Sequence, residues 1–273
     1  MVGLILALVF GHSSRVHATE PDGNRLVTVS MLSDTVAIEP AKPFRLAVRL
    51  KIEPGWHIYW VNPGDSGVPT SIEWNLPTGF TVGPLQWPAP NAFDVPGGMV
   101  NYGYEDEVLL FATVTPPTTL DSKNLQFSAE VAWLVCTDEQ CLPGSGGASV
   151  ALPAGKATAS DAHAAVDRWA KAVPVAADDS PDVSRIDFGA DGTLSVAWAT
   201  PVKEVQWFPL PSDQVAPRPA KLTGDARQTV VQVAANAPEG KSTPQGSKSV
   251  LAYTNAQGER RGLLVDFPRA GGE

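Results

Sequence analysis

Short stretches of alternating apolar and polar residues, separated by prolines and glycines, fill the first half of this chain. The segment from Arg45 to Ile52 alternates in this way, and the segment from Leu125 to Val135 places an apolar residue at every second position. A period of two puts one set of side chains on one face of a β-strand. The sequence also holds 25 prolines and 24 glycines in 273 residues, and these residues favour turns between short elements. The pattern predicts an all-β protein with a β-sandwich over residues 25–153.

Beyond this sandwich the sequence predicts one helix and a second, smaller β-domain. Apolar residues recur at helical spacing from Ser160 to Val173, with Ser160 as the N-cap. This helix falls within a predicted linker, residues 158–175. Strand-like runs return over residues 181–270, where two pairs of runs are predicted to form hairpins. The second β-domain contains no cysteine, and we expect no chemistry of its own there.

The segment 87–104 differs from the alternating runs around it. It contains three prolines and the adjacent pair Gly97 and Gly98, and this composition predicts an irregular loop without regular elements. Long loops in compact domains often cover or form binding sites. A lid or binding loop is therefore one interpretation, and a solvated connector is the other.

The N-terminus resembles a secretory signal peptide, residues 1–18. Nine apolar residues follow Met1, and small and polar residues lead to Val16-His17-Ala18, a pattern that predicts cleavage after Ala18. The run lacks a preceding basic residue, so an apolar N-terminus without targeting function is the alternative. No other stretch approaches the 18 apolar residues that span a bilayer. We expect a mature chain that is exported to the periplasm and does not itself cross the membrane.

Charge and ligand counts exclude several classes of function. A net charge of -9 without a basic cluster disfavours nucleic-acid binding. A structural zinc site takes about four ligands, whereas Cys136, Cys141, His57 and His163 are the only cysteines and histidines beyond the predicted signal peptide. We therefore expect neither a metal nor another cofactor. No nucleophile motif accompanies His57, and this disfavours hydrolysis.

Cys136 and Cys141 enclose a four-residue loop that we expect at a hairpin tip, within disulfide reach. Closing so short a loop stabilises a protein by about 2 kcal/mol, against nearly 5 kcal/mol for about a hundred residues. The spacing therefore favours redox chemistry over stabilisation without excluding a structural disulfide. Asp138 and Glu139 lie in the loop, and negative charges raise thiol pKa values. The pair suits a passive exchange partner better than a self-activated nucleophile.

Several segments together resemble the N-terminal periplasmic domain of the DsbD and ScsB family of thiol:disulfide interchange proteins. They are Gly55-Trp56-His57-Ile58-Tyr59-Trp60, the Trp-Pro-Ala-Pro loop with Phe93, the stretch from Tyr102 to Glu107, and the closing Cys-x4-Cys-Leu-Pro. The match covers residues 25–153, and the trailing helix and second β-domain are more similar to the ScsB branch. The cysteine spacing is one residue shorter than in the best-known DsbD pattern.

The resemblance implies an immunoglobulin-like sandwich with a redox-active cysteine pair. It implies that Cys141 forms mixed disulfides with partners, that Cys136 resolves them, and that Phe93 lies on a cap loop. It also places His57 and Tyr59 beside the cysteines, and it places Asp138 and Glu139 in the active-site loop. In this family, electrons pass from cytoplasmic thioredoxin through a membrane domain and a thioredoxin-like module, and cytochrome c biogenesis is among the processes served.

No membrane segment and no Cys-x-x-Cys module follow residue 153. We therefore expect a carrier that works with thioredoxin-like periplasmic proteins and a membrane thiol transporter, either as a stand-alone chain or as a piece of a longer protein. The predicted function is transfer of electrons from such a partner to oxidised periplasmic proteins, as a protein-disulfide reductase-type carrier. The alternative is a non-catalytic secreted β-sandwich that binds other molecules and has a structural disulfide.

Overall fold

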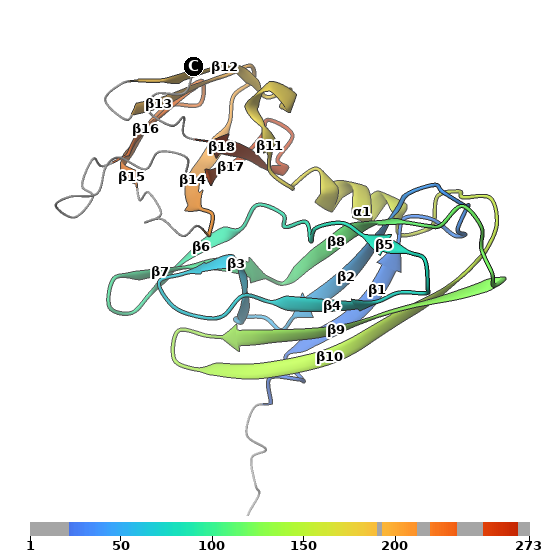
Figure 1. Cartoon of the computed structure of the whole chain (residues 1–273). Helices are drawn as coiled ribbons and strands as arrows, with labels where there is room; N and C mark the ends of the chain where they lie inside the picture. Colours follow the sequence, from blue (N-terminus) through green and yellow to red (C-terminus); the bar gives the residue numbers. More distant parts are fainter. Residues whose placement is uncertain (1–21, 190–192, 212–218, 234–247, 267–273) are drawn as a thin grey trace, which may run out of the picture.

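The structure is a computed structural model that describes residues 22–189, 193–211, 219–233 and 248–266. Three predicted segments lie outside these ranges: the signal peptide, residues 190–192 of the turn predicted before Thr193, and the end of the second β-domain. Within them the chain is almost wholly β, as the sequence predicts, and has the expected immunoglobulin-like character. Figure 1 shows a long sandwich with a smaller β-rich part above the end that carries β6 and β7.

Two sheets form the long sandwich. One sheet has the order β1 (Val27–Ser33), β2 (Phe44–Ile52), β8 (Glu107–Thr115) and β5 (Thr81–Val82). The other has the order β10 (Cys141–Pro153), β9 (Asn124–Cys136), β3 (His57–Gly64), β7 (Met99–Glu105) and β6 (Asn91–Val95), and β4 (Ser71–Asn75) also pairs with β9. All pairings within these two sheets are antiparallel.

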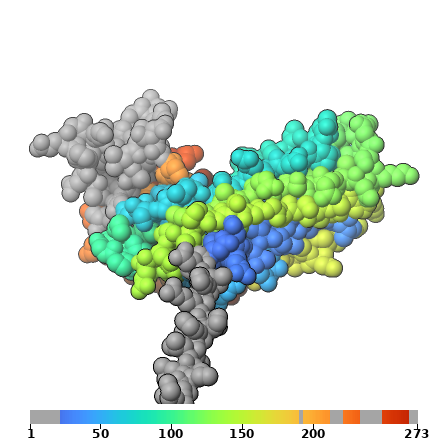
Figure 2. All heavy atoms as spheres, turned by 90° about the horizontal axis from the view of Figure 1, so that it is seen from below, coloured from blue at the N-terminus to red at the C-terminus, as the bar shows by residue number. Residues whose placement is uncertain are grey.

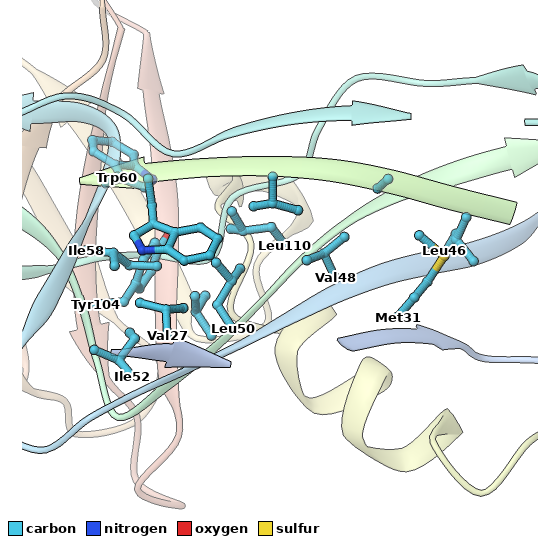
Figure 3. Close-up of a cluster of buried hydrophobic side chains, with 14 of the residues drawn as sticks. Val27, Met31, Leu46, Val48, Leu50, Ile52, Ile58, Trp60, Tyr104 and Leu110 are labelled. Atoms are coloured by element: carbon cyan, nitrogen blue, oxygen red, sulfur yellow. The ribbon is translucent and has the colours of Figure 1, made fainter. Parts of the chain in front are cut away.

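The core between the two sheets follows from strand alternation. Leu46, Val48 and Leu50 of β2 point into it, as do Ile58 and Trp60 of β3 (Figure 3). All five side chains are at most 1% exposed. Because successive residues of a strand face opposite sides, His57 and Tyr59 are directed to the other face of β3. Packing of Ile58 and Trp60 on one face of β3 thus fixes the direction of His57 and Tyr59 on the other.

The segment 87–104 is more regular than its prolines and glycines predict. β6 and β7 form an antiparallel hairpin in which Val95 pairs with Met99, so the expectation of an irregular loop was wrong. Gly97 and Gly98 have positive φ angles of 92° and 74°, which glycine adopts without steric cost. The glycine pair builds the turn of a hairpin instead of interrupting a loop.

The sequence after the second cysteine is also a strand, although Pro143-Gly144 suggests a turn. Pro143 pairs with Leu134 and Gly144 with Trp133 along β10. β10 is at the edge of its sheet, where a proline without an N–H group is tolerated. A Cβ atom on Gly144 would lie 2.4 Å from the Trp133 Nε1 atom, so glycine at this position allows the indole to pack closely.

The described residues contain one α-helix, α1 (His163–Ala170), and it is shorter than the predicted segment from Ser160 to Val173. Ser160 Oγ accepts a hydrogen bond from the Ala162 N–H at 3.1 Å and donates one to the Ser33 carbonyl oxygen at 2.5 Å. It therefore ties the chain to β1 in a turn before the helix, and it does not occupy the N-cap. The residues that follow Ala170 continue as turns.

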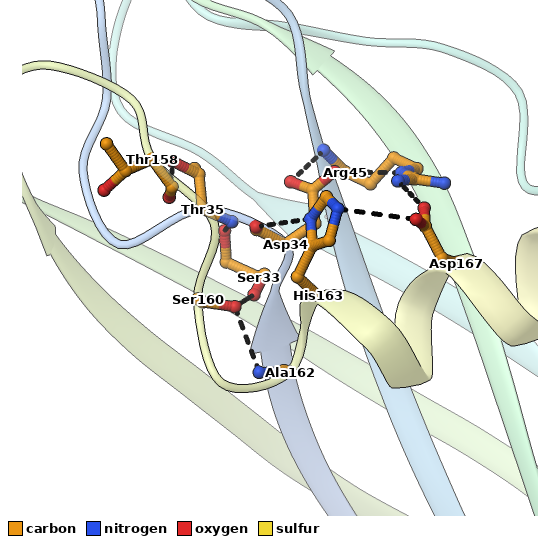
Figure 4. A network of polar contacts seen from close by, with 9 residues as sticks. All are labelled: Ser33, Asp34, Thr35, Arg45, Thr158, Ser160, Ala162, His163 and Asp167. Atoms are coloured by element: carbon orange, nitrogen blue, oxygen red, sulfur yellow. Dashed lines mark hydrogen bonds and ion pairs between the residues drawn. The ribbon is translucent and has the colours of Figure 1, made fainter.

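Helix α1 covers the outer face of the β1–β2–β8 sheet. Val166 packs against Ala47, Leu109 and Phe111. Beside this contact the Arg45 guanidinium binds both Asp34 and Asp167 (Figure 4). The helix thus belongs to the surface of the first sandwich, although it lies between the two β-rich parts in the sequence.

The second β-rich part contains two further sheets. One has the order β11 (Val175–Ala176), β18 (Arg260–Asp266), β17 (Lys248–Thr254) and β14 (Lys203–Pro209). The other has the order β12 (Val183–Phe188), β13 (Thr193–Trp198), β16 (Gln228–Val233) and β15 (Pro219–Gly224), and a 3-10 helix spans Ala177–Asp179. The two predicted hairpins are confirmed as the pairs β12–β13 and β17–β18.

The β14–β17–β18 sheet is buried on both faces. Leu251 and Tyr253 of β17 point into the core of the second part, whereas Val250 and Ala252 pack with the core of the long sandwich. Phe208 of β14 lies on the same side as Val250 and is fully buried. The two β-rich parts therefore share an apolar interface.

Phe208 contacts aromatic rings of the long sandwich. Its ring centroid lies 6.0 Å from Trp60 and 5.1 Å from Tyr102 of β7, both in edge-to-face arrangements. Two polar contacts flank these rings: Asn62 Nδ2 donates to the Pro209 carbonyl oxygen at 2.7 Å, and Arg260 Nη2 donates to the Pro90 carbonyl oxygen at 2.8 Å. The second part therefore contacts the chain immediately before β6.

We expect Phe208→Ala to lower the free energy of unfolding by about 3–5 kcal/mol, because it leaves a cavity among buried rings. Urea denaturation of the full chain measures this change. Val36→Ala, at a side chain that is 46% exposed, serves as the control and should change stability by less than about 0.5 kcal/mol. A loss below about 1 kcal/mol for Phe208→Ala would contradict a packed interface.

Candidate functional site

The two cysteines close the tip of the β9–β10 hairpin. Cys136 and Cys141 are directly opposite each other in the register, and they form a disulfide with a Cα–Cα distance of 4.1 Å. The Thr137 N–H donates to the Gln140 carbonyl oxygen at 2.9 Å. Thr137 Oγ1 also accepts hydrogen bonds from the backbone N–H groups of Glu139 and Gln140. The predicted hairpin tip is thus confirmed, and its loop is held by its own backbone.

The two cysteines differ in their access to solvent. Cys136 is 1% exposed, whereas Cys141 is exposed. Figure 2 shows the β9–β10 tip at the same end of the molecule as the turn of the β6–β7 hairpin. An incoming thiolate must approach along the S–S axis, and access decides which sulfur it attacks. Cys141 is the sulfur that the surface presents.

His57 and Tyr59 extend from β3 toward the cysteines. His57 is paired with Cys136 in the β3–β9 register. The Tyr59 hydroxyl donates a hydrogen bond to Cys136 Sγ at 3.0 Å and lies 3.9 Å from Cys141 Sγ. The structure therefore brings both residues to the disulfide, on the face of β3 opposite Ile58 and Trp60.

Three further residues hold Tyr59, and the sequence alone did not reveal them. Asn101 Nδ2 donates to the Tyr59 hydroxyl at 3.4 Å, and Asn101 Oδ1 accepts from the Ser66 backbone N–H at 3.1 Å and the Ser66 hydroxyl at 3.0 Å. A Cβ atom on Gly67 would lie 2.3 Å from the Tyr59 ring. Their role depends on which strands are neighbours, so no local pattern indicates it.

Phe93 lies on β6 and covers His57. The two rings are stacked, with their centroids 4.8 Å apart and an angle of 15° between their planes. His57 also makes an edge-to-face contact with Tyr59 at 5.3 Å. The β6 strand is thereby connected to the cysteine loop through an aromatic pair, with Phe93 outermost.

A pocket of roughly 670 Å³ opens beside this aromatic pair. Its lining includes His57, Phe93 and the four carboxylates of Asp94, Glu105, Asp138 and Glu139. Asp138 and Glu139 of the cysteine loop therefore line this pocket. Asp94 and Glu105 join them because β6 and β7 bring the hairpin next to the cysteine loop.

The polar groups nearest the sulfurs favour their neutral forms. Burial lowers the pKa of His57, and the negative charge of Asp138 partly offsets this effect. Burial also raises the pKa of the Tyr59 hydroxyl. At neutral pH the site thus offers the cysteines an O–H donor and an uncharged imidazole. It does not offer an imidazolium to stabilise a thiolate.

The described residues contain no cluster of three or more histidines, cysteines, aspartates or glutamates that could hold a metal. A buried and an exposed sulfur in one short hairpin, next to an O–H donor, suit the formation and resolution of mixed disulfides. These features define the class as a thiol:disulfide interchange domain.

Comparison with known proteins assigns this domain to a family. The family model for "Thiol:disulfide interchange protein DsbD, N-terminal" matches residues 25–152, and this part of the chain is a DsbD N-terminal domain. The predicted resemblance is therefore confirmed over somewhat less than half of the 273 residues. No curated protein matches the sequence.

One solved structure extends the likeness to the fold of almost the whole chain. The N-terminal periplasmic domain of ScsB from Proteus mirabilis is 21% identical with a TM-score of 0.61, over 90% of this chain and 95% of that chain. The DsbD N-terminal domain of Neisseria meningitidis in the reduced form is 10% identical with a TM-score of 0.28, over 50% of this chain and 90% of that chain. The ScsB likeness shows that both β-rich parts follow a known arrangement. No helix in the described ranges is long and apolar enough to span a membrane.

We expect the pKa of His57 to lie below the ordinary value of about 6.5, because burial disfavours the imidazolium. Asp138→Asn removes the charge that opposes this effect, so it should lower the His57 pKa further. NMR titration of the histidine ring protons measures both values. Glu139→Gln is the matched control and should leave the His57 pKa nearly unchanged; an equal shift in both variants would contradict a specific Asp138 effect.

Proposed function

We propose that this chain is a periplasmic dithiol–disulfide carrier that passes electrons from a membrane or thioredoxin-like partner to oxidised periplasmic proteins. The observation that carries the proposal is the asymmetry of the pair, with Cys141 exposed and Cys136 at 1% exposure. The family match supports the class of partner, and the periplasmic origin named for the ScsB domain supports the location. Export through residues 1–18 belongs to the same proposal.

The proposed reaction proceeds in two exchanges. In the reduced carrier, the Cys141 thiolate attacks a partner disulfide, and the partner's second sulfur leaves as a thiolate. The Cys136 thiolate then attacks Cys141 Sγ, which closes the Cys136–Cys141 disulfide and releases, as a thiolate, the partner sulfur that was bonded to Cys141. The partner gains two electrons and the carrier loses two. An upstream dithiol reverses both steps on the carrier and restores its thiols.

Tyr59 and Phe93 have distinct proposed roles. The Tyr59 hydroxyl donates to Cys136 Sγ, so the same donor is in place to stabilise the thiolate of the resolving cysteine. Phe93 covers His57 beside the pair, and we assign it the role of a cap that limits access to the sulfurs. The carboxylates of Asp138 and Glu139 form the outer edge of the site.

A thiol-trapping experiment tests the carrier. We expect Cys136→Ser to accumulate mixed disulfides through Cys141 with periplasmic proteins, because the resolving sulfur is gone. Cys141→Ser is the matched control and should trap much less, since Cys136 is buried. Non-reducing gels with mass spectrometry measure the adducts. If neither variant traps a partner and the wild-type pair does not exchange with a thioredoxin-like protein, the disulfide is structural and the proposal fails.

Access to the thiols provides a separate test of the cap. We expect Phe93→Ala to increase the rate of alkylation of the reduced cysteines several-fold, since the ring no longer covers the site. Met99→Ala, in the same hairpin and at a side chain that is 41% exposed, controls for general loosening of β6 and β7. Equal rates in the Phe93 variant and wild type would remove Phe93 from the site.

A further inference from the structure

The pocket beside the disulfide carries uncompensated negative charge. Asp94 comes from β6, Glu105 from β7, and Asp138 and Glu139 from the cysteine loop, so three separate elements bring carboxylates to one opening. All four residues are exposed. None of them forms a salt bridge within the ranges that the structure describes. The pocket lining contains no lysine or arginine.

A second feature of the same pocket is an unpaired buried nitrogen. His57 lines the pocket and is only 5% exposed, and its Nε2 atom is buried without a hydrogen-bond partner among the described residues. Buried polar atoms are nearly always hydrogen-bonded in folded proteins. A ligand that brings an N–H donor would satisfy this atom when the imidazole carries its proton on Nδ1.

We propose that this pocket binds a basic segment of the redox partner, with a lysine or arginine next to the partner's reactive cysteine. The proposal rests on the carrier function described above and adds the chemistry of its partner. A cationic side chain complements the four carboxylates, and its N–H groups, or those of its backbone, match the acceptor on His57. The pocket lining includes Gln140, the residue before Cys141, so a segment bound there can bring its own sulfur to the exposed end of the disulfide.

Other occupants fit the pocket less well. The described residues form no cluster suited to a metal ion, and an acidic segment would face four like charges. Because the carboxylates are exposed, their main effect is on the encounter of the two molecules. The consequence is a faster reaction with basic partners at low salt, which screening by added salt removes.

Three short peptide thiols test this inference. Their sequences are Lys-Cys-Lys, Ser-Cys-Ser and Glu-Cys-Glu, and their ends are acetylated and amidated. Each reduces the disulfide of the oxidised full chain: its thiolate attacks Cys141, Cys136 leaves as a thiolate, and a second peptide thiol releases the first as a peptide disulfide. The rate constants, expressed per peptide thiolate, are measured by maleimide labelling of the freed cysteines.

We expect the basic peptide to react about tenfold faster than the neutral one at low salt, within the range of electrostatic steering. The acidic peptide should be slower than the neutral one. The three rate constants should become nearly equal at about 1 M salt, where the Debye length is about 3 Å. Equal rates for the three peptides at low salt, or a faster acidic peptide, would overturn the proposal.

Matched variants locate the effect. Asp138→Asn with Glu139→Gln should remove most of the preference for the basic peptide. Glu73→Gln with Glu130→Gln, a register pair on β4 and β9 with the same change in net charge, should retain it; an equal loss in both double variants would show that net charge and not the pocket is responsible. His57→Phe should reduce the ratio of the basic peptide's rate to the neutral peptide's rate, and an undiminished ratio would overturn the assignment of Nε2.

The neutral peptide separates this inference from the carrier function. If Ser-Cys-Ser reduces the disulfide but the basic peptide has no advantage, the carrier remains and the basic partner segment is wrong. If no peptide reduces the disulfide in the folded chain, the carrier function fails and the inference fails with it.

Discussion

The alternation of side chains along β3 is the constraint on which the site depends. Ile58 and Trp60 are buried in the core of the long sandwich. Because side chains alternate along a strand, His57 and Tyr59 must lie on the opposite face of β3. A shift of one residue in the register would turn the polar pair into the core of the sandwich and the apolar pair toward the cysteines. Packing of the core thus holds the side chains of His57 and Tyr59 next to the sulfurs. Asn101 and Ser66 then fix the remaining freedom of the Tyr59 hydroxyl.

The second β-rich part packs against the β6–β7 hairpin, which carries the proposed cap residue Phe93. Its β14–β17–β18 sheet is packed on both faces, so it joins the two parts through apolar contact as well as through a linker. Phe208 packs against Tyr102 on β7, and Arg260 binds the carbonyl of Pro90 just before β6. Burial lowers the pKa of Arg260 to about 10, so this side chain is still a cation at neutral pH. The base of the β6–β7 hairpin is therefore supported from outside the DsbD N-terminal domain.

Much of the fold could be predicted from the sequence because it depends on local periodicity. The alternation of β2 and β9, the two hairpins of the second part and the cysteine hairpin all follow from residues that are close in sequence. The β6–β7 hairpin was missed because its prolines and glycines mark the ends and turn of short strands that only their neighbours stabilise. The length of α1 was overestimated because Ser160 binds β1, a contact that no helical pattern contains.

The candidate site follows from the sequence only in part. The cysteines identified it, and the family resemblance added His57, Tyr59, Phe93, Asp138 and Glu139. Asp94 and Glu105 reach the pocket through strand pairing across the sheet, and such long-range neighbours are invisible to spacing. The role of Asn101 likewise depends on the pairing of β7 with β3, which brings its side chain to Tyr59.

The register of the cysteine hairpin has one more consequence. Cys136 and Cys141 are ladder partners, and the backbone that holds them is paired along the whole of β9 and β10. The covalent bond therefore connects two positions that the sheet already keeps adjacent, and we expect the backbone to be nearly the same in both oxidation states. We therefore expect each exchange of the proposed carrier to proceed with little rearrangement of its backbone.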